Sequence, residues 1–228
     1  MGTKYNPSVV RDGLMIYLDA ANPRSYPGTG NTWYDLKRNI NFALQNSPSF
    51  LSNSAGGSIG FTTANAHYAL SSTSLATMTR FTSEVWHYYT ATNSGGSPAI
   101  ISETYPGSNN RIQINLGSQG ATTDLRISYF NGSWNNSSPF TLTANNWYHI
   151  VGTYDGANLR LYINGVNEIT TANTGTPVAN TTGIRLMRRW DNAEYWGGHL
   201  STVKIYNRAL SQAEVLQNYN ATKKRYEK

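Results

Sequence analysis

Apolar and polar positions alternate along much of the chain, and the alternation is clearest over residues 146–166, NWYHIVGTYDGANLRLYINGV. Successive side chains of a strand point to opposite faces, and the first part of this segment carries bulky groups on both faces. This part is therefore predicted to be a central strand. Asp155-Gly156 and Asn164-Gly165 serve as turns, because these residue types tolerate the positive φ that tight hairpins need. The whole segment predicts an antiparallel meander of three strands.

The same pattern predicts further strands, and residues rich in Gly, Pro, Asn and Ser separate nearly all of them. The first covers residues 13–20, GLMIYLDA, in which Leu14, Ile16 and Leu18 point to one face. Residues 21–56 are expected to be mainly loop. The other expected strands are 42–44, 57–62, 67–71, 81–90, 98–104, 110–116, 124–131, 183–188 and 198–207. This many short strands with so little helix indicates an all-β protein.

One helix is predicted, at about residues 211–222. Ser211 is followed three positions later by Glu214, which is the spacing of a capping box, where each side chain accepts from the backbone N–H of the other residue. Three apolar side chains at helical spacing would pack over one end of the sheets: Val215, Leu216 and Tyr219. The residues that follow, 223–228, are expected to remain a free basic tail.

Composition narrows the class of protein. A chain of 228 residues can bury one sizeable core, so we expect one domain at 13–222, preceded by an arm at 1–12. The chain has no cysteine, and therefore neither a disulfide nor a thiolate metal site. Half of the formal net charge of +6 lies in residues 223–228. The remaining cations are dispersed and follow no recognition motif, which argues against nucleic acid as a partner. No apolar run reaches the length of a membrane span, so membrane insertion is not expected.

Three segments together carry a resemblance to a known family. They are FTSEVWHYY at residues 81–89, WYHIVGTYDGANLRLYINGV at 147–166, and GGHLSTVKIYNRALSQAEVLQNYN at 197–220. In this order they resemble the laminin-G-like, concanavalin A-like domains. The opening GLMIYLDAANPRSYPGTGNTWYDL and the ending NYNATKKRY are similar to a subgroup of that family found in bacteriophage virion proteins.

The resemblance implies a fold and a setting. The fold is a two-sheet antiparallel β-sandwich, the concanavalin A-like jelly roll, with a short C-terminal α-helix and with loops that hold calcium or sugar in many relatives. The subgroup implies a non-enzymatic structural or surface protein located on a virion, in its tail, fibre or capsid. Other virion subunits and host surface glycans would be its partners, and assembly into an oligomer or particle is expected.

Two other functions stay open at this point. One is a secreted or enzyme-attached carbohydrate-binding module, although the first residues contain no apolar run of signal-peptide length. The other is a glycoside hydrolase, because some relatives carry two catalytic carboxylates in an E-x-D-x-x-E strand. No Glu of this chain is followed two positions later by Asp, and the nearest approach is Asp191 with Glu194. The sequence therefore favours a protein that is not an enzyme.

Exposed aromatic side chains on polar loops are the expected sugar-binding residues, because aromatic rings stack on the apolar faces of pyranoses. The candidates are Trp134, Trp190, Tyr195 and Trp196, with Arg188 as a hydrogen-bond donor. The alternative for Trp134 and Trp190 is packing on loop backbone. Two further tryptophans, Trp86 and Trp147, lie within strand patterns and are expected in the core.

Calcium is the cofactor that such loops would hold, and no other cofactor is indicated. Asp35 stands where relatives carry a calcium motif, although two cations follow it in the turn. The second candidate site is the oxygen-rich group Asp191, Asn192 and Glu194. The alternative is that Asp191 only caps a turn or pairs with Arg188 or Arg189.

Overall fold

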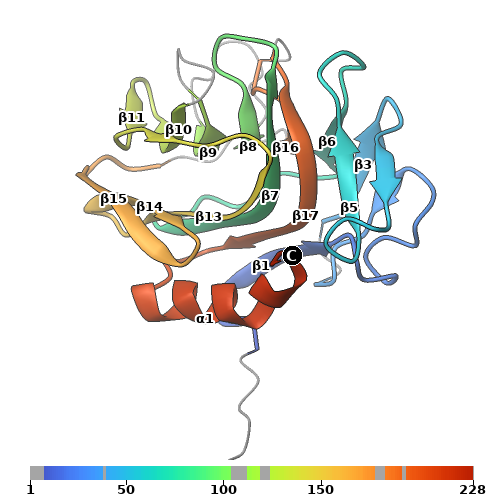
Figure 1. Cartoon of the computed structure of the whole chain (residues 1–228). Helices are drawn as coiled ribbons and strands as arrows, with labels where there is room; N and C mark the ends of the chain where they lie inside the picture. The colour runs from blue at the N-terminus through green and yellow to red at the C-terminus, as the bar shows by residue number, and fades with distance from the viewer. Residues whose placement is uncertain are drawn as a thin grey trace, which may run out of the picture.

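The computed structural model describes residues 8–37, 40–103, 112–118, 124–177, 183–191 and 194–227, without the side chains of 112–114. These residues form two antiparallel β-sheets that pack face to face, with one α-helix on the outer side of one sheet (Figure 1). The predicted β-sandwich with a short C-terminal helix is therefore confirmed.

One sheet, here called sheet A, contains both the first strand and the last strand of the chain. Its strands run in the order β15 (Val166–Ala172), β14 (Asn158–Ile163), β13 (Asn146–Tyr154), β7 (Phe81–Asn93), β17 (Trp196–Tyr206), β5 (Ser58–Phe61) and β4 (Ser49–Leu51), and β1 (Leu14–Asp19) also pairs with β17. The predicted meander forms as β13, β14 and β15. Strand β13 lies between β7 and β14, which confirms it as a central strand.

The opposite sheet, sheet B, is built mainly from the middle of the chain. Its order is β11 (Trp134–Asn136), β10 (Asp124–Phe130), β9 (Ile112–Gly117), β8 (Ala99–Glu103), β16 (Ile184–Leu186), β6 (Tyr68–Ser71), β3 (Phe42–Gln45) and β2 (Thr32–Trp33), and β12 (Phe140–Thr141) pairs with β10. Strands β2, β4, β11 and β12 were not expected from the sequence. Each has only two or three residues, which is too short for a visible alternation.

The core lies between the two sheets. Inward side chains of β7 and β13, such as Val85 and Ile150, are fully buried against inward side chains of sheet B, such as Ile127. The sheets approach closely at Gly152 of β13, where an added Cβ would lie 2.5 Å from Cδ1 of Ile127. A side chain at this position would push the sheets apart, so the glycine is needed for close packing.

The predicted helix forms as α1 (Gln212–Thr222), and its capping box between Ser211 and Glu214 is confirmed. Val215 is fully buried as expected. The prediction for Leu216 is wrong, because its side chain is 44% exposed. Asn218 points at the sheet instead and is fully buried. Among the described residues, no helix is long and apolar enough to cross a membrane.

A buried charged cluster holds α1 on the outer face of sheet A. Glu84, Lys204 and His149 are fully buried there, although charged side chains are rarely buried without a partner. Lys204 Nζ donates to Glu84 Oε1 at 2.6 Å, and His149 Nε2 lies 3.0 Å from the same oxygen. The other oxygen, Oε2, accepts from Asn218 Nδ2 at 2.6 Å. The burial of the Asn218 amide is therefore explained by its hydrogen bond to the carboxylate of Glu84 beneath α1.

The same amide also holds the arm that precedes β1. Val10 N donates to Asn218 Oδ1 at 2.7 Å, and Tyr206 OH donates to Val10 O at 3.2 Å. Asn218 Nδ2 donates in turn to Tyr206 OH at 2.9 Å. Sheet A, α1 and the end of the N-terminal arm are thus joined by one hydrogen-bonded network.

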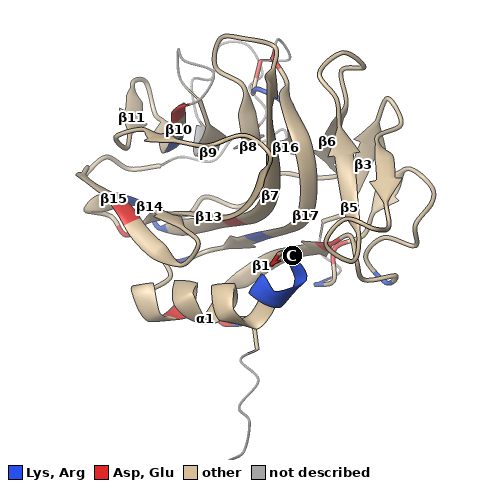
Figure 2. Ribbon diagram, in the orientation of Figure 1, with Lys and Arg blue, Asp and Glu red and all other residues tan. Residues whose placement is uncertain are grey.

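The segment expected to be a free basic tail is docked on the domain. Residues Lys223–Arg225 form a 3-10 turn, η1, which Figure 2 shows in blue beside the C-terminus. Arg225 makes two hydrogen bonds of 3.0 Å to the carboxylate of Asp19, and the ring of Tyr226 stacks on Trp86 with centroids 3.7 Å apart. The prediction of a free tail is therefore wrong for residues 223–227, and Lys228 lies outside the described residues.

Candidate functional site

A row of polar side chains crosses the outer face of sheet B. Residues paired directly across neighbouring strands share one face of a sheet. Arg185 of β16 pairs with Ser102 of β8, and Ser102 pairs with Asn115 of β9. Asn115 pairs in turn with Ser128 of β10, and Ser128 with Asn136 of β11. Ile101, Leu116, Ile127 and Leu186, which adjoin four of these residues, lie in the core, so the polar side chains line the outer face together.

These polar side chains are shielded from solvent, and some of their atoms lack a partner. Ser102 and Ser128 are fully buried, Asn115 is 2% exposed and Arg185 is 7% exposed. Asn115 Nδ2 donates to Ser128 Oγ at 3.1 Å. Within the described part of the chain, the amide oxygens of Asn115 and Asn136 accept no hydrogen bond. A buried unpaired polar atom costs about 1–3 kcal/mol, so these oxygens would be stabilised by any donor that reaches them.

Two of the predicted tryptophans meet beside this row. Trp134 of β11 and Trp190 lie with ring centroids 6.1 Å apart and an interplanar angle of 48°. Phe130 of β10 packs against Trp134 at 5.1 Å. All three rings are only partly buried, so they present apolar surface beside the polar row. Arg185 connects the two features, because its NH1 donates to Trp190 O at 2.7 Å.

The predicted Arg188 lies between two tyrosine rings. Its guanidinium carbon is 4.3 Å from the ring centroid of Tyr68 and 5.0 Å from that of Tyr195, within the range of a cation–π contact. Ser102 Oγ donates to Arg188 O at 3.0 Å, which ties this segment to the polar row. Burial, followed by repulsion from Arg188, lowers the pKa of Arg185. Tyr68 was missed by the sequence analysis, although alternation in 67–71 places it opposite the core residue Ala69.

Trp196 was predicted to bind sugar, and this prediction is wrong. The residue begins β17, and its side chain is fully buried in the core. Its indole Nε1 donates to Nε2 of the buried His87 at 3.0 Å, so both the ring face and the polar atom are occupied within the protein. Trp86 and Trp147 were both expected in the core. Trp86 is buried at 2% exposure, whereas Trp147 is only partly buried.

The predicted carboxylates near Trp190 are paired with a cation. Arg189 Nε lies 3.3 Å from Asp191 Oδ1, and Arg189 NH1 lies 2.8 Å from Glu194 Oε1. Glu194 also accepts a hydrogen bond from the backbone N–H of Ser97. The alternative of an Asp191–Arg189 pair is thus confirmed. An arginine between both carboxylates does not fit a calcium site, and Asn192 lies outside the described residues.

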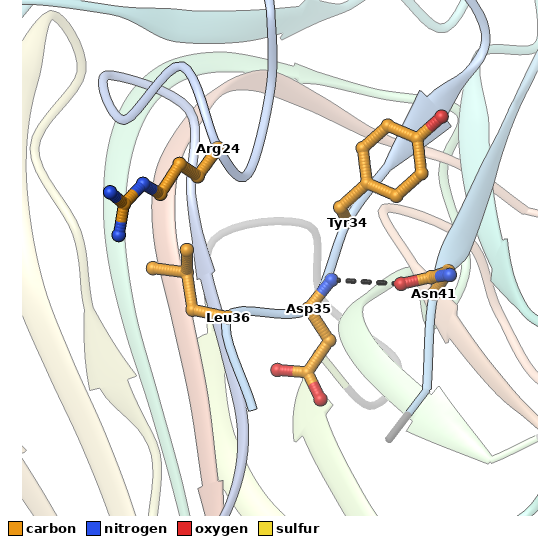
Figure 3. Close-up of a pocket in the computed structure, with 5 residues that line it drawn as sticks. All are labelled: Arg24, Tyr34, Asp35, Leu36 and Asn41. Carbon is orange, nitrogen blue, oxygen red and sulfur yellow. Dashed lines mark hydrogen bonds between the residues drawn. The ribbon is translucent and has the colours of Figure 1, made fainter. Parts of the chain in front are cut away.

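Asp35, the other metal candidate, stabilises a turn through its carboxylate. Figure 3 shows it in a surface cavity of about 660 Å³, with the carboxylate pointing away from Arg24 and Tyr34. Oδ1 accepts from the backbone N–H of Tyr17 at 2.8 Å and of Lys37 at 3.0 Å. Oδ2 accepts from Ile40 N at 3.3 Å. In the part of the chain that the structure describes, no group of three or more His, Asp or Glu side chains could hold a metal ion.

The family of the chain follows from a match that spans most of the sandwich. The model of the concanavalin A-like lectin/glucanases superfamily, of the laminin G type, matches residues 61–216. The chain belongs to this superfamily. This confirms the resemblance that the strand and turn motifs carried.

Solved structures with the same concanavalin A-like fold come from several proteins that act on or bind other molecules. Domain 4 of AbnA, an extracellular GH43 arabinanase from Geobacillus stearothermophilus solved with arabinotriose, is 15% identical with a TM-score of 0.71, over 90% of this chain and 98% of that domain. Trypanosoma rangeli sialidase with sialic acid is 16% identical with a TM-score of 0.68, and the match covers 95% of this chain but only 34% of the sialidase.

A further similar structure is the binding domain of Paraclostridial Mosquitocidal Protein 1, which is 17% identical with a TM-score of 0.67. The match covers 92% of this chain and 52% of that one. No curated protein sequence matches the chain. At such identities the structural likeness establishes the concanavalin A-like fold and nothing finer.

Proposed function

We propose that this concanavalin A-like domain is a non-catalytic glycan-binding protein and that the outer face of sheet B binds the glycan. The observation that carries the proposal is the pair of partly buried rings, Trp134 and Trp190, beside the unpaired amide oxygens of Asn115 and Asn136. Aromatic rings contact the apolar faces of a sugar, and amides bond its hydroxyl groups. A glycan needs both kinds of contact side by side.

A non-catalytic role is supported by the state of the acids at this face. A retaining or inverting glycosidase needs one carboxylate that can ionise and a second that can donate a proton. Asp191 and Glu194 both contact Arg189, and Asp124 lies 3.6 Å from Arg126. These carboxylates are therefore already engaged in ion pairs with arginines of the protein. Unchanged hydrolysis of a bound glycan after Asp191→Asn and Glu194→Gln would support the absence of catalysis by these acids.

Glycan-array binding of the purified protein, in calcium and then in chelator, tests the main proposal. Trp134→Ala and Trp190→Ala should each weaken binding by at least about tenfold, because each removes one stacking surface. Tyr34→Ala is the matched control, since Tyr34 is an exposed aromatic residue elsewhere on the molecule, and it should leave binding unchanged. Equal binding by all variants, or no binding by the wild type, would overturn the proposal. Loss of binding in chelator would add calcium to the site.

The setting proposed for this glycan binding is the surface of a bacteriophage virion, where the protein would contact neighbouring subunits and host glycans. The opening and ending motifs of the chain support this setting. Quantitative mass spectrometry of purified particles tests it, because a virion component has a fixed copy number per particle. Absence of the protein from washed particles would contradict it.

An enzyme-attached or secreted carbohydrate-binding module is the second candidate. It is favoured by the extent of the match to domain 4 of the arabinanase, which covers 98% of that domain. The two settings share the same glycan-binding face and differ in what surrounds the domain. Recovery of the protein in culture medium, free of particles, would support the second.

A further inference from the structure

The outer face of sheet A carries a second row of residues, to which no function has yet been assigned. Gly60 of β5 pairs with His199 of β17, His199 pairs with Tyr88 of β7, and Tyr88 pairs with Trp147 of β13. The four residues therefore follow one another across four neighbouring strands on the same face. The row places three ring side chains next to a glycine.

The rings of this row contact one another. His199 and Tyr88 are stacked, with centroids 5.1 Å apart and planes at 24°. Tyr88 and Trp147 lie 5.5 Å apart, and Tyr226 of the C-terminal turn packs on Trp147 at 5.0 Å. Trp147, Tyr88 and His199 are all only partly buried. The row thus forms a continuous aromatic surface that solvent can reach.

The C-terminal segment covers sheet A as far as the Trp147 end of this row. Tyr226 stacks on Trp86, and Thr222 accepts a hydrogen bond from the Trp86 indole at 2.8 Å. Two positions further along β7, on the same face, lies Tyr88, which borders open space instead. The rest of the aromatic row is therefore the first part of this face that α1 and η1 leave uncovered.

Two cavities meet at this row and share His199. The first, of about 380 Å³, is lined by the aromatic residues Tyr88, Trp147 and Tyr226, and by Asn53 and Ser54. The second, of about 410 Å³, is lined by the hydroxyl-bearing residues Ser49, Thr62, Thr63, Thr90 and Thr92 together with apolar residues such as Leu51 and Phe61. An aromatic cavity and a hydroxyl-lined cavity are thus adjacent, each of a volume suited to a small ligand.

The charge of this region indicates a neutral ligand. Among the described residues that line the two cavities there is no carboxylate, and the one cation is Arg225. Its guanidinium already donates to both oxygens of Asp19 and to Ser201 Oγ at 3.0 Å. Burial lowers the pKa of His199, so its imidazole is neutral at neutral pH. Neither an acidic nor a basic ligand would find a charged partner here.

We propose that the two cavities form a second carbohydrate site, on the opposite sheet from the first, for a neutral oligosaccharide. One sugar ring stacks on Trp147 and Tyr88, and the next unit places its hydroxyl groups against Thr90 and Thr92. The site uses no residue of the sheet B face and does not depend on the function proposed for that face. With both sites filled, one domain would hold two glycan chains on opposite sides.

Nuclear magnetic resonance of the nitrogen-15-labelled protein tests this site directly. Cellotetraose, xylotetraose, chitotetraose, maltotetraose and mannotetraose are titrated separately while the indole N–H signals are followed. At least one of these neutral probes should shift the Trp147 signal. Shifts limited to Trp134 and Trp190 would support the sheet B site and overturn this one. No shift of Trp147 with any probe would also overturn it.

Substitutions then separate the contribution of each cavity. Thr92→Trp fills the hydroxyl-lined cavity from an exposed position and leaves every ring of the row in place. It should weaken binding of the active probe by at least about tenfold, as should Trp147→Ala. Thr92→Trp is the decisive variant, because Trp147→Ala also removes packing on Tyr226. Tyr34→Ala, at an exposed aromatic residue outside both proposed sites, is the matched control and should leave this affinity unchanged. Wild-type affinity in Thr92→Trp would contradict the proposal.

Discussion

The outer faces of the two sheets both bury polar side chains, but they do so in different ways. Under α1, both carboxylate oxygens of Glu84 accept hydrogen bonds from Lys204 and Asn218. On sheet B, the amide oxygens of Asn115 and Asn136 are buried and accept none within the described residues. Polar groups that are satisfied by the chain stabilise the fold, whereas unsatisfied ones are available for a ligand. Substitutions should therefore mainly affect stability under α1 and mainly affect binding on sheet B.

The largest effect is expected from Glu84→Ala. This change leaves Lys204 buried without its counter-ion, and breaking a buried ion pair from one side costs about 3–5 kcal/mol. Urea denaturation measures the free energy of unfolding. The double variant Glu84→Leu/Lys204→Met is the control, and it should recover most of the loss because it removes both charges. If Glu84→Ala lowered the free energy of unfolding by less than about 1 kcal/mol, the expected difference between the two faces would be contradicted.

The helix-covered face should also make stability depend on pH. Burial lowers the pKa of His149, although Glu84 partly opposes the shift, and burial lowers the pKa of His87 to about 3. Below pH 6.5 both histidines therefore bind a proton less readily in the folded state than in the unfolded chain. Their contribution is present above pH 6.5 and is lost as the pH falls toward the folded values.

His87 alone should lower the free energy of unfolding by about 1.4 kcal/mol per pH unit below 6.5, and His149 should add to the fall. Lys204 and His149 outweigh the burial of Glu84 and hold its pKa at about 2, so Glu84 adds a further loss only below about pH 4.5. Denaturation curves from pH 7 to pH 4.5 measure the slope. A flat profile in this range would be the contrary result, and Trp134→Ala should show the wild-type slope.

Asn218→Ala should cost about 2 kcal/mol, because it removes the hydrogen bond to the ionised Glu84 and the anchor of Val10 N. Leu216→Ala on the same helix is the matched control. It should change the free energy of unfolding by less than about 0.5 kcal/mol, since Leu216 is 44% exposed. Thermal or urea unfolding of both variants compares them. Equal losses of unfolding free energy in the two variants would mean that the Asn218 amide does not hold α1 on sheet A.

Ser211→Ala should cost about 1 kcal/mol by removing the N-cap of α1. Its hydroxyl accepts from Glu214 N at 3.3 Å, and the change leaves the buried network intact. The measurement is the midpoint of urea denaturation. Ser211→Asp, which also caps helices, should retain wild-type stability, and a loss as large as that in the alanine variant would argue against a capping role.

The smallest effect on stability is expected on sheet B. Trp134→Ala should lower the free energy of unfolding by less than about 1 kcal/mol, because the partly buried ring loses mainly its contacts with Trp190 and Phe130. Its effect on glycan binding should be much larger than its effect on folding. A strongly destabilised variant with unchanged binding would reverse the comparison between the two faces.

The central meander and the helix cap were readable from the sequence because local rules decide them. Asn164-Gly165 fits the positive φ of its turn, with Asn164 at 52° and Gly165 at 82°. Ser211 and Glu214 lie within one helical turn of each other, so their spacing alone specifies the cap. For the candidate site, the sequence identified Trp134, Trp190, Tyr195 and Arg188 from residue type and polar surroundings, and all four lie at the sheet B face.

The remaining features depend on residues far apart in the chain. In the sequence, Trp196 resembles the neighbouring aromatic residues that were expected on a loop. Its ring lies in the core because β17 begins at this residue. From the sequence alone, Asn218 would be placed on the exposed side of the helix. In the structure it lies over Glu84, which is 134 residues away in the chain and accepts a hydrogen bond from its amide. The polar row and the aromatic row each take one side chain from several strands, and no local pattern links those strands.

The sequence by itself determined the longer strands, the turns of the meander and the helix cap, because alternation, φ preferences and capping act within a few residues. It also determined the family, since those local motifs occur in the family's order. The tertiary structure alone decided which polar groups are satisfied and which are not. The pairing of polar groups depends on which strands are neighbours and on where α1 and η1 end. It separates the part of sheet A under α1, which stabilises this protein, from the surfaces proposed to bind glycans.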